Sequence, residues 1–495
     1  MQKRRSITHD LAWTAMTSVG LIVGNVVLNY FLARRGAVDV FGPYNLAKRL
    51  AAGLVPALTL GMTIGVVRFI AATTSAERRR EYQWTAIAAT LAVLGACTAL
   101  VVWGAEPLSR LVLGYTDAGL LLSMWGYTVA LALNALIYSF YRGELKQSKA
   151  NWNNLWAMTG IPVLVVGLAP RGWNAEALLT AVTVIVVVWN GSQVVGRLVR
   201  SLKTGPVGRR VREASAPLLA FSLPRIPALV SDELVTAVPP LIANQAAQAS
   251  TASFLLAGMS FATIVSAALQ ALNVVLLPRI SEMHATGRTD AIRDITSRLF
   301  YIVGVTSAIS VPLLYAATGD LVAVWLGEGF APANPIVRIV ILSIPAVVTY
   351  SPLRSIVDGT MKRPLNSYAS ILGIGLCVAL SYVLGPESGL MLAAAYVIGR
   401  WIATALVVTV ISARIRPAFS PLHVLVSAIL ALAAGFGIQY AAGDWSGTIA
   451  ALARILATGV VGAGGLFAAL WYAPGHLGLR PILERALRRG GDRRA

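Results

Sequence analysis

Cysteine and histidine are scarce in this sequence, and their scarcity argues against two kinds of protein. Only two cysteines occur among 495 residues, Cys97 and Cys377, each within an apolar run and far from the other. Such a pair suggests no disulfide framework, so we expect both to be packing residues. The four histidines are scattered, and no H-E-x-x-H motif or clustered Cys/His spacing predicts a metal site: His9, His284, His423 and His476.

Sequence signatures of nucleotide use and of catalysis are lacking too. No G-x-x-x-x-G-K-[ST] phosphate-binding loop occurs, which excludes an ATP-driven pump encoded in this chain. The loops predicted on the external side are short, whereas a membrane glycosyltransferase or ligase is expected to carry a large external loop with catalytic acids. We therefore expect no enzyme activity and no cofactor.

Charged residues are few, and long hydrophobic runs take their place. Charged residues make up 13% of the chain and hydrophobic residues 57%, with a mean hydropathy of +0.70. Runs of about twenty apolar residues, enough to cross a bilayer as a helix, recur throughout. The basic opening MQKRRSITHD leads into the first run without a cleavage signal, so we expect a retained span. We predict an all-α polytopic membrane protein with fourteen transmembrane helices, at residues 8–33, 41–67, 82–104, 118–141, 152–169, 176–198, 214–242, 250–277, 297–318, 334–357, 366–384, 388–411, 421–441 and 447–472.

Lysine and arginine are distributed unequally between the predicted loops. Of the 41 such residues, 31 fall at the two termini and in one set of alternate loops, six fall in spans, and only four fall in the opposite loops. Because cytoplasmic loops retain cations during insertion, this pattern places both termini in the cytoplasm. The topology, together with attraction to anionic membrane lipids, accounts for the formal charge of +20 without a nucleic-acid partner.

An internal repeat divides the chain. A shift of 210 residues aligns Phe31–Ala47 with Leu241–Ala257 without a gap, and further weak matches follow in the same order. The repeat predicts two pseudo-symmetric six-helix lobes of parallel orientation plus two extra C-terminal helices, and such repeats are typical of transporters. The predicted parts are an N-terminal lobe at 1–200, a cytoplasmic linker at 201–213, a C-terminal lobe at 214–413, spans 13 and 14 at 414–473, and a basic amphipathic tail at 474–495.

Several short motifs carry a resemblance to a known family. FGPY opens the second span, VVRFIA ends it, LPRIS echoes that ending after the eighth span, and GELK and GTMK occupy cytoplasmic loops. This pattern resembles the polysaccharide branch of the multidrug/oligosaccharidyl-lipid/polysaccharide exporter superfamily, which contains Wzx-type and lipid II flippases. The resemblance covers the whole chain in layout, through packing motifs rather than catalytic ones. It implies a rocking transporter of lipid-linked sugars in the bacterial cytoplasmic (inner) membrane, with a cavity between two lobes.

Two adjacent cations, Lys48 and Arg49, lie about two turns inside the second span. One charge at the bilayer centre costs roughly 3 kcal/mol, so a partner or a function is expected. Lys48 lies roughly 10 Å from the external end of its helix, and Asp232 and Glu233 of the seventh span lie about 12 to 14 Å from theirs. Because the resemblance implies that both spans face the cavity, we expect the basic and acidic pairs to meet there.

The intramembrane charges admit two interpretations. In one, they pair only with each other and hold the lobes together. The other is favoured, because intramembrane ionisable groups are functional candidates by default. In it, Lys48, Arg49 and Arg225 bind a substrate diphosphate. Asp232 and Glu233 then act in gating or ion coupling.

Other polar residues inside the spans are weaker candidates. Asn25, Asn29, Gln270 and Asn273 are more often interhelical hydrogen-bond partners than sugar ligands. For Arg400 packing is favoured over a place in the cavity. All five remain candidates for cavity residues.

Taken together, these features predict a flippase that moves a polyprenyl-diphosphate-linked oligosaccharide or lipid-linked cell-wall precursor to the external leaflet by alternating access. The alternatives are a cation-coupled multidrug exporter, whose cavity should be acidic and aromatic, and a non-transporting scaffold in an envelope-synthesis complex. Basic residues in the cavity disfavour the exporter. Expected partners are the lipid-linked substrate, anionic membrane lipids, and polysaccharide polymerases or glycosyltransferases. The tail from His476 is interpreted as an interfacial helix or as a plain cationic anchor.

The predicted topology is testable by labelling. Cysteines introduced at Gly208 and Gly443 should react with a membrane-impermeant thiol reagent from opposite sides, because the first position lies in the predicted cytoplasmic linker and the second in the last predicted external loop. Reaction of both from the same side would contradict the fourteen-span topology.

Overall fold

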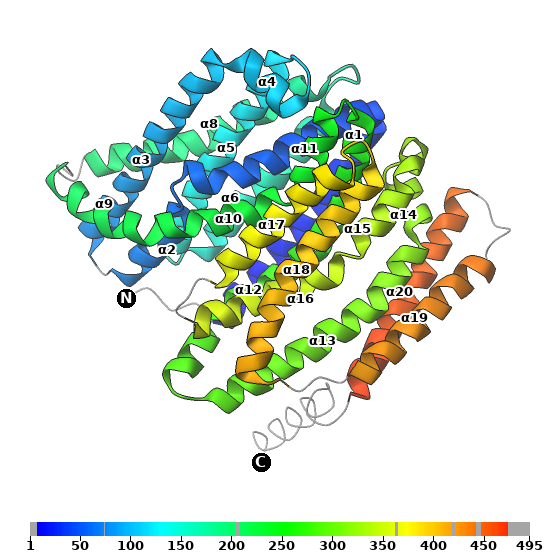
Figure 1. The fold of residues 1–495 in the computed structure, drawn as a ribbon. Helices are drawn as coiled ribbons and strands as arrows, with labels where there is room; N and C mark the ends of the chain where they lie inside the picture. Colours follow the sequence, from blue (N-terminus) through cyan, green and yellow to red (C-terminus); the bar gives the residue numbers. More distant parts are fainter. Residues whose placement is uncertain are drawn as a thin grey trace. The chain divides into compact units, whose positions relative to one another are not determined.

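The computed structural model describes residues 7–73, 75–202, 208–361, 365–417, 421–441 and 447–473, and within these ranges it contains helices and turns but no β-strand (Figure 1). The α-helices are α1 (Ile7–Leu58), α2 (Met62–Ala72), α3 (Ala76–Trp103), α4 (Ala105–Leu113), α5 (Ala118–Gly143), α6 (Gln147–Leu155), α7 (Ile161–Leu168), α8 (Ala175–Leu202), α9 (Gly208–Ser222), α10 (Ile226–Leu234), α11 (Val238–Gln245), α12 (Ala249–Ala285), α13 (Thr289–Ala316), α14 (Thr318–Trp325), α15 (Asn334–Ile341), α16 (Ile344–Thr360), α17 (Leu365–Leu384), α18 (Gly389–Ile415), α19 (Pro421–Ala441) and α20 (Thr448–Trp471). One π-helical turn, Trp156–Gly160, and two 3₁₀ turns, Leu223–Arg225 and Glu328–Ala333, join neighbouring helices.

The helices confirm an all-α polytopic membrane fold, whereas the count of fourteen spans is not confirmed. Among the described residues, nine helices are long and apolar enough to cross a membrane, and three bent pairs raise the number to as many as twelve. Each of these twelve falls on a predicted span. The other two predicted spans fall on α6 and α7, which the π-helical turn separates, and on α12, whose described apolar part is Ala249–Ile264.

The first predicted span and most of the second are contained in α1, which folds back on itself. The side-chain amide of Asn45 donates to Asn29 Oδ1 over 2.9 Å, and the ammonium of Lys48 donates to Asn25 Oδ1. A straight helix would hold residues 16 positions apart about 24 Å from each other. These pairs are therefore possible only because the chain reverses near residue 37, so that the two arms lie antiparallel.

Three spans are bent at a break between helices, one of them by 44° between α15 and α16. Leu60 and Gly61 adopt positive φ angles of 50° and 65° between α1 and α2, whose axes differ by 53°. The seventh span is divided into α9, α10 and α11, and it bends by 63° before α11, where Pro239 and Pro240 begin the helix. Proline lacks a backbone N–H and clashes with the preceding turn, so the break before α11 occurs where the sequence places two prolines.

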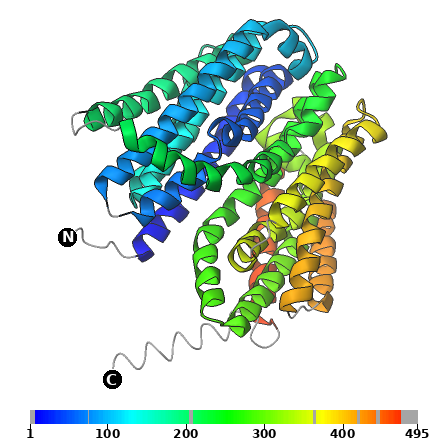
Figure 2. The same cartoon turned by 60° about the vertical axis from the view of Figure 1, so that its left-hand side comes forward.

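The chain forms two compact units by its internal contacts: residues 1–259 with 370–399, and residues 260–369 with 400–495. In the first unit, α3, α5 and α8 lie side by side in both views (Figure 1, Figure 2). The predicted lobes on either side of the 201–213 linker stay a prediction. Residues 203–207 of that linker and the predicted tail from residue 474 lie outside the described residues.

In the second unit, an ion pair ties the last hairpin to the helices before it. Arg454 of α20 donates from Nε and Nη2 to the two carboxylate oxygens of Asp320 in α14, over 2.9 and 2.6 Å. Gln439 of α19 donates to the same carboxylate over 3.1 Å. Arg454 is one of the six cations within predicted spans, and this contact gives it a structural role.

Removing the carboxylate should loosen this hairpin. In the Asp320→Asn variant, Arg454 keeps one hydrogen-bond acceptor but loses the other together with its counter-charge, and a buried charged donor without its partner costs about 1 to 3 kcal/mol. We expect a lower thermal unfolding midpoint of the detergent-solubilised protein. The exposed Glu387→Gln is the matched control, and an equal effect of both changes would contradict a special role for this pair.

Candidate functional site

The polar cluster in the first unit starts with Lys48, one of the two adjacent cations in the middle of the second span. Its ammonium donates to the neutral amide oxygen of Asn25 on the opposite arm of α1. One turn closer to the hairpin apex, Asn45 joins the buried Asn29 across the same two arms. A ladder of amides therefore lines the seam between the arms, and Lys48 is held there without a counter-charge from its hydrogen-bond partner.

Arg49, the next residue, lies on a different face of the helix and meets other elements. It interacts electrostatically with Glu233 of α10 and with Tyr396 of α18. The two helices α1 and α10 approach closely because Gly53 has no side chain, and a Cβ atom there would lie 2.2 Å from Leu234 Cδ2. Glycine at this position allows the basic arm of α1 to approach the acidic residues of α10.

Asp232, the neighbour of Glu233, accepts a hydrogen bond from the hydroxyl of Ser370 in α17 over 2.7 Å. The cluster therefore joins α1, α10, α17 and α18, all through residues of the first unit. Its ionisable groups are two cations and two carboxylates, so the formal charges balance. Such a balance lowers the cost of keeping ionised side chains within a span.

The end of the first unit that is predicted to be external is closely packed. A Cβ atom on Gly42 of α1 would lie 2.0 Å from Ser253 Oγ of α12, and that hydroxyl donates to the carbonyl of Val38 over 3.0 Å. Beside this contact is a pocket of about 200 Å³ lined by residues including Leu46 and Leu256. The polar cluster therefore lies deeper in the span than a tight contact between α1 and α12.

The remaining predicted site residues lie apart from the cluster or outside the described part of the chain. Arg225 precedes α10, its guanidinium lies 3.7 Å from the centre of the Phe221 ring, and it donates to the Phe221 carbonyl over 2.5 Å. It stands two turns, about 10 Å, from Asp232 along the helix. Arg400 belongs to the second unit, with its guanidinium 5.8 Å from the centre of the Tyr350 ring. The side chains of Gln270 and Asn273 lie outside the described residues.

Sequence reasoning missed three members of the cluster. Asn45 precedes Lys48 by three residues, a spacing that places both on one helical face, so the sequence contained a signal for it. Ser370 and Tyr396 are more than a hundred residues away from α10 and α1 in the sequence. Nothing in their own neighbourhoods indicates that they reach these helices.

The comparisons with known proteins support the fold. No protein-family model matches the sequence, and no curated protein matches it. The chain is similar to the solved structure of the lipid II flippase MurJ in an inward closed conformation, with 13% identity, a TM-score of 0.72, and coverage of 91% of this chain and 97% of that one. It is also similar to an inward-facing multidrug resistance MATE family transporter of the MOP superfamily, with 11% identity, a TM-score of 0.63, and coverage of 81% and 98%. A further similar structure is that of a mutant form of the Vibrio cholerae MATE transporter VcmN, with 16% identity, a TM-score of 0.52, and coverage of 82% and 96%. The chain therefore has the fold of these transporters.

Proposed function

We propose that this protein is a flippase that moves a polyprenyl-diphosphate-linked oligosaccharide, or a related lipid-linked cell-wall precursor, from the cytoplasmic to the external leaflet. The observation that carries the proposal is the pair of mid-span cations, Lys48 and Arg49, within a fold similar to that of a lipid II flippase. The protein is then a transporter and not an enzyme. It acts in the bacterial cytoplasmic membrane with both termini inside, alongside the polymerases or glycosyltransferases of the same process.

The chemistry of the cluster suits an anionic cargo. Lys48 is held by a neutral amide, so it can bind a phosphate without first leaving a carboxylate. Arg49 offers the planar fork that binds phosphate oxygens in a bidentate manner. An inside-negative membrane potential favours the outward movement of an anion by roughly 2.3 kcal/mol per charge per 100 mV.

A multidrug exporter is the second candidate, and the similarity to MATE transporters supports it. An organic cation would be attracted by Asp232 and Glu233 in place of the basic pair. The two candidates differ in the sign of charge that the site must bind. Binding of a lipid diphosphate sugar and of a cationic dye to the purified protein, measured side by side, separates them.

The flippase proposal predicts that Arg49 is needed as a cation. Arg49→Gln should abolish flipping of a lipid diphosphate sugar in proteoliposomes at normal protein abundance, whereas Arg49→Lys should retain part of it because a point charge still binds phosphate. Arg225→Gln tests the more distant arginine in the same assay. The exposed Arg110→Gln is the control and should flip normally. Full activity of both Gln variants would leave Arg49 and Arg225 with a structural role only.

We also predict that the acidic pair helps to keep the external side closed. We propose that the basic pair faces the acidic pair through Arg49 and Glu233 when that side is closed, and that both Lys48 and Arg49 face the diphosphate when substrate is bound. A buried charge that loses its partner is costly, so substrate would replace the carboxylates as the lobes separate. A ligand shifts such an equilibrium only through different affinities for its two states.

The measurement is thiol labelling of Leu46→Cys, a buried position beside the close contact of Gly42 with Ser253. Combining it with Asp232→Asn and Glu233→Gln should raise external labelling without substrate. Glu106→Gln with Glu387→Gln, which neutralises two exposed carboxylates, is the control and should leave labelling low. Equal labelling of the Leu46→Cys parent and the acidic-pair variant would show that the acidic pair does not keep the external side closed.

A further inference from the structure

A basic pocket in the first unit lies away from the polar cluster. It has a volume of about 680 Å³ and lies among the ends of α3, α5, α6 and α8. We call it the basic chamber. Six cations line it against a single carboxylate, Glu144; the cations are Arg79, Arg80, Lys146, Lys149, Arg197 and Arg200. These residues belong to the loops and helix ends that the charge distribution places in the cytoplasm.

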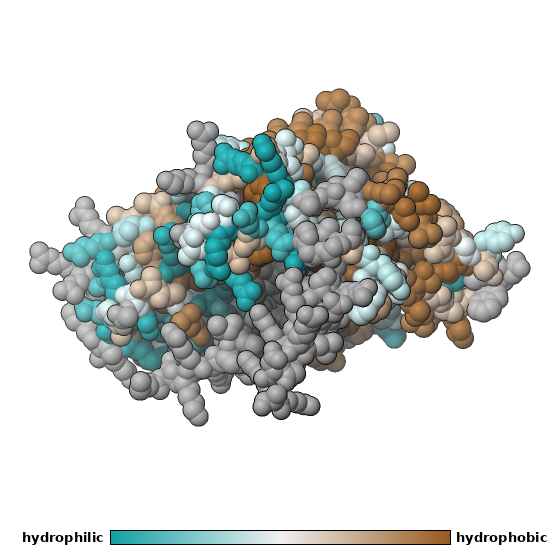
Figure 3. Space-filling view, turned by 90° about the horizontal axis from the view of Figure 1, so that it is seen from below, coloured by the Kyte–Doolittle hydropathy of each residue, from teal (hydrophilic) through white to brown (hydrophobic). Residues whose placement is uncertain are grey.

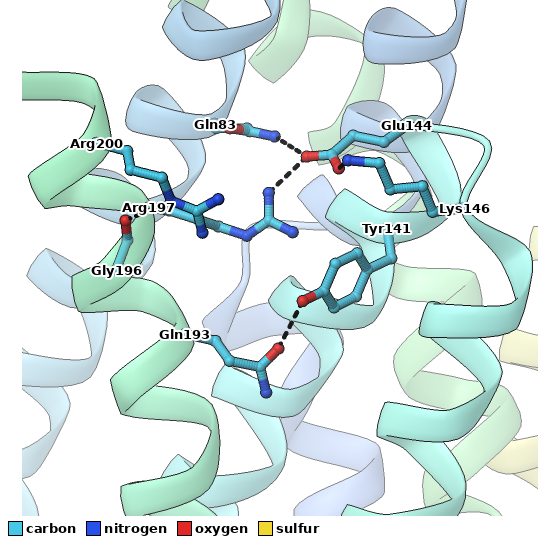
Figure 4. A network of polar contacts seen from close by, with 8 residues as sticks. All are labelled: Gln83, Tyr141, Glu144, Lys146, Gln193, Gly196, Arg197 and Arg200. Carbon is cyan, nitrogen blue, oxygen red and sulfur yellow. Dashed lines mark hydrogen bonds and ion pairs between the residues drawn. The ribbon is translucent and has the colours of Figure 1, made fainter. Parts of the chain in front are cut away.

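Glu144 organises one wall of the basic chamber (Figure 4). Its carboxylate accepts hydrogen bonds from Gln83 of α3 over 2.8 Å, from Lys146 over 2.6 Å and from Arg197 of α8 over 2.5 Å. Burial would raise the pKa of Glu144, but the charge of Arg197 and hydrogen bonds from Lys146 and Arg197 lower it overall. The carboxylate is therefore ionised at neutral pH and ties three helices together at this end.

The other cations leave the chamber strongly positive, because one carboxylate cannot balance six of them. Arg79 donates from Nε and Nη2 to the Thr73 carbonyl, and an arginine has five N–H donors in total. Arg197 lies 4.7 Å from the centre of the Tyr141 ring, and its buried Nε has no hydrogen-bond partner among the described residues. Basic pockets between transmembrane helices on the cytoplasmic side are places where phosphate headgroups bind.

A second pocket, of about 460 Å³, shares Tyr141 and Lys149 with the chamber. Its walls include two tryptophan residues, Trp152 and Trp189, which are 54% and 38% exposed. They also include Gln193, which accepts a hydrogen bond from the Tyr141 hydroxyl over 2.9 Å. We call it the aromatic groove. Tryptophan is enriched at membrane interfaces, where one part of the ring meets apolar chains and the N–H meets polar groups.

The helix that carries Trp189 and Gln193 also has an exposed apolar side. Along α8, the apolar residues Val188, Val195 and Val199 are exposed, as expected for a helix side in contact with acyl chains. A molecule of the bilayer can therefore reach the groove sideways. On the face seen from below, Figure 3 shows a group of hydrophilic residues.

We propose that the basic chamber and the aromatic groove form one binding site for an anionic glycerophospholipid. The phosphate lies among the cations of the chamber, and an acyl chain lies over Trp152 and Trp189 in the groove. The apolar surface beside the groove favours a lipid over a free phosphate. This site is separate from the proposed transport site and does not rest on it.

The first test compares lipid binding by matched double variants of the full-length protein in detergent. The probe is phosphatidylglycerol, with phosphatidylcholine as the uncharged reference, and retention is followed by native mass spectrometry. Lys149→Gln with Arg200→Gln removes two exposed cations of the chamber and should weaken phosphatidylglycerol binding about tenfold to thirtyfold. Arg279→Gln with Arg414→Gln removes the same charge from exposed positions outside the chamber and should leave binding unchanged.

The second test identifies the source of the phosphate. Trp152→Ala with Trp189→Ala should weaken phosphatidylglycerol binding and leave binding of inorganic phosphate unchanged, because only the lipid reaches the groove. Inorganic phosphate should compete weakly against the lipid. If the chamber double variant and the control double variant lose lipid binding equally, only the overall charge of the protein matters. If inorganic phosphate competes fully and the Trp changes have no effect, the site binds soluble anions. Either result would overturn the proposal, and neither depends on whether the protein flips a lipid-linked sugar.

Discussion

The cost of keeping an ionised side chain within a membrane span explains which polar side chains contact each other inside the first unit. A single charge there costs roughly 3 kcal/mol when it is unpaired. Lys48 meets Asn25, Arg49 interacts with Glu233 and Tyr396, and Asp232 accepts a hydrogen bond from a serine of α17. These interactions connect four helices, so satisfying the charges also fixes how the helices pack.

The backbone must allow these charges to meet, and glycine and proline make this possible. Gly53 lets α1 approach α10, and Gly42 lets α1 approach α12 at the other end of the same arm. Prolines divide the seventh span into short helices on either side of the acidic pair. Broken helices are tolerated at membrane depth where protein or a cavity surrounds the freed backbone groups.

Much of the fold could be predicted from the sequence, because hydrophobic length and cation distribution are local properties. Twelve of the predicted spans correspond to apolar helices or bent pairs, and the prolines of the seventh span indicated its breaks. The reversal within α1 was predicted as well, because spans at 8–33 and 41–67 require a turn between them, and the hydrogen bond of Asn45 with Asn29 agrees with it. Ser370 and Tyr396 were not predictable, because they reach the cluster only through the packing of distant helices. The pairing of Arg454 with Asp320 was missed for the same reason.

The unequal partners of the two adjacent cations suggest an order of events in the proposed transport cycle. Lys48 is held by a neutral amide, so an arriving diphosphate replaces a single hydrogen bond with a charge pair. Arg49 must first give up its interaction with Glu233, and that exchange is favourable only once the anion is close enough to replace the carboxylate as the counter-charge of Arg49. Binding at Lys48 therefore comes first and brings the phosphate within reach of Arg49. In this order, Glu233 loses its interaction with Arg49 only after substrate has bound. Separation of α1 from α10 therefore depends on bound substrate.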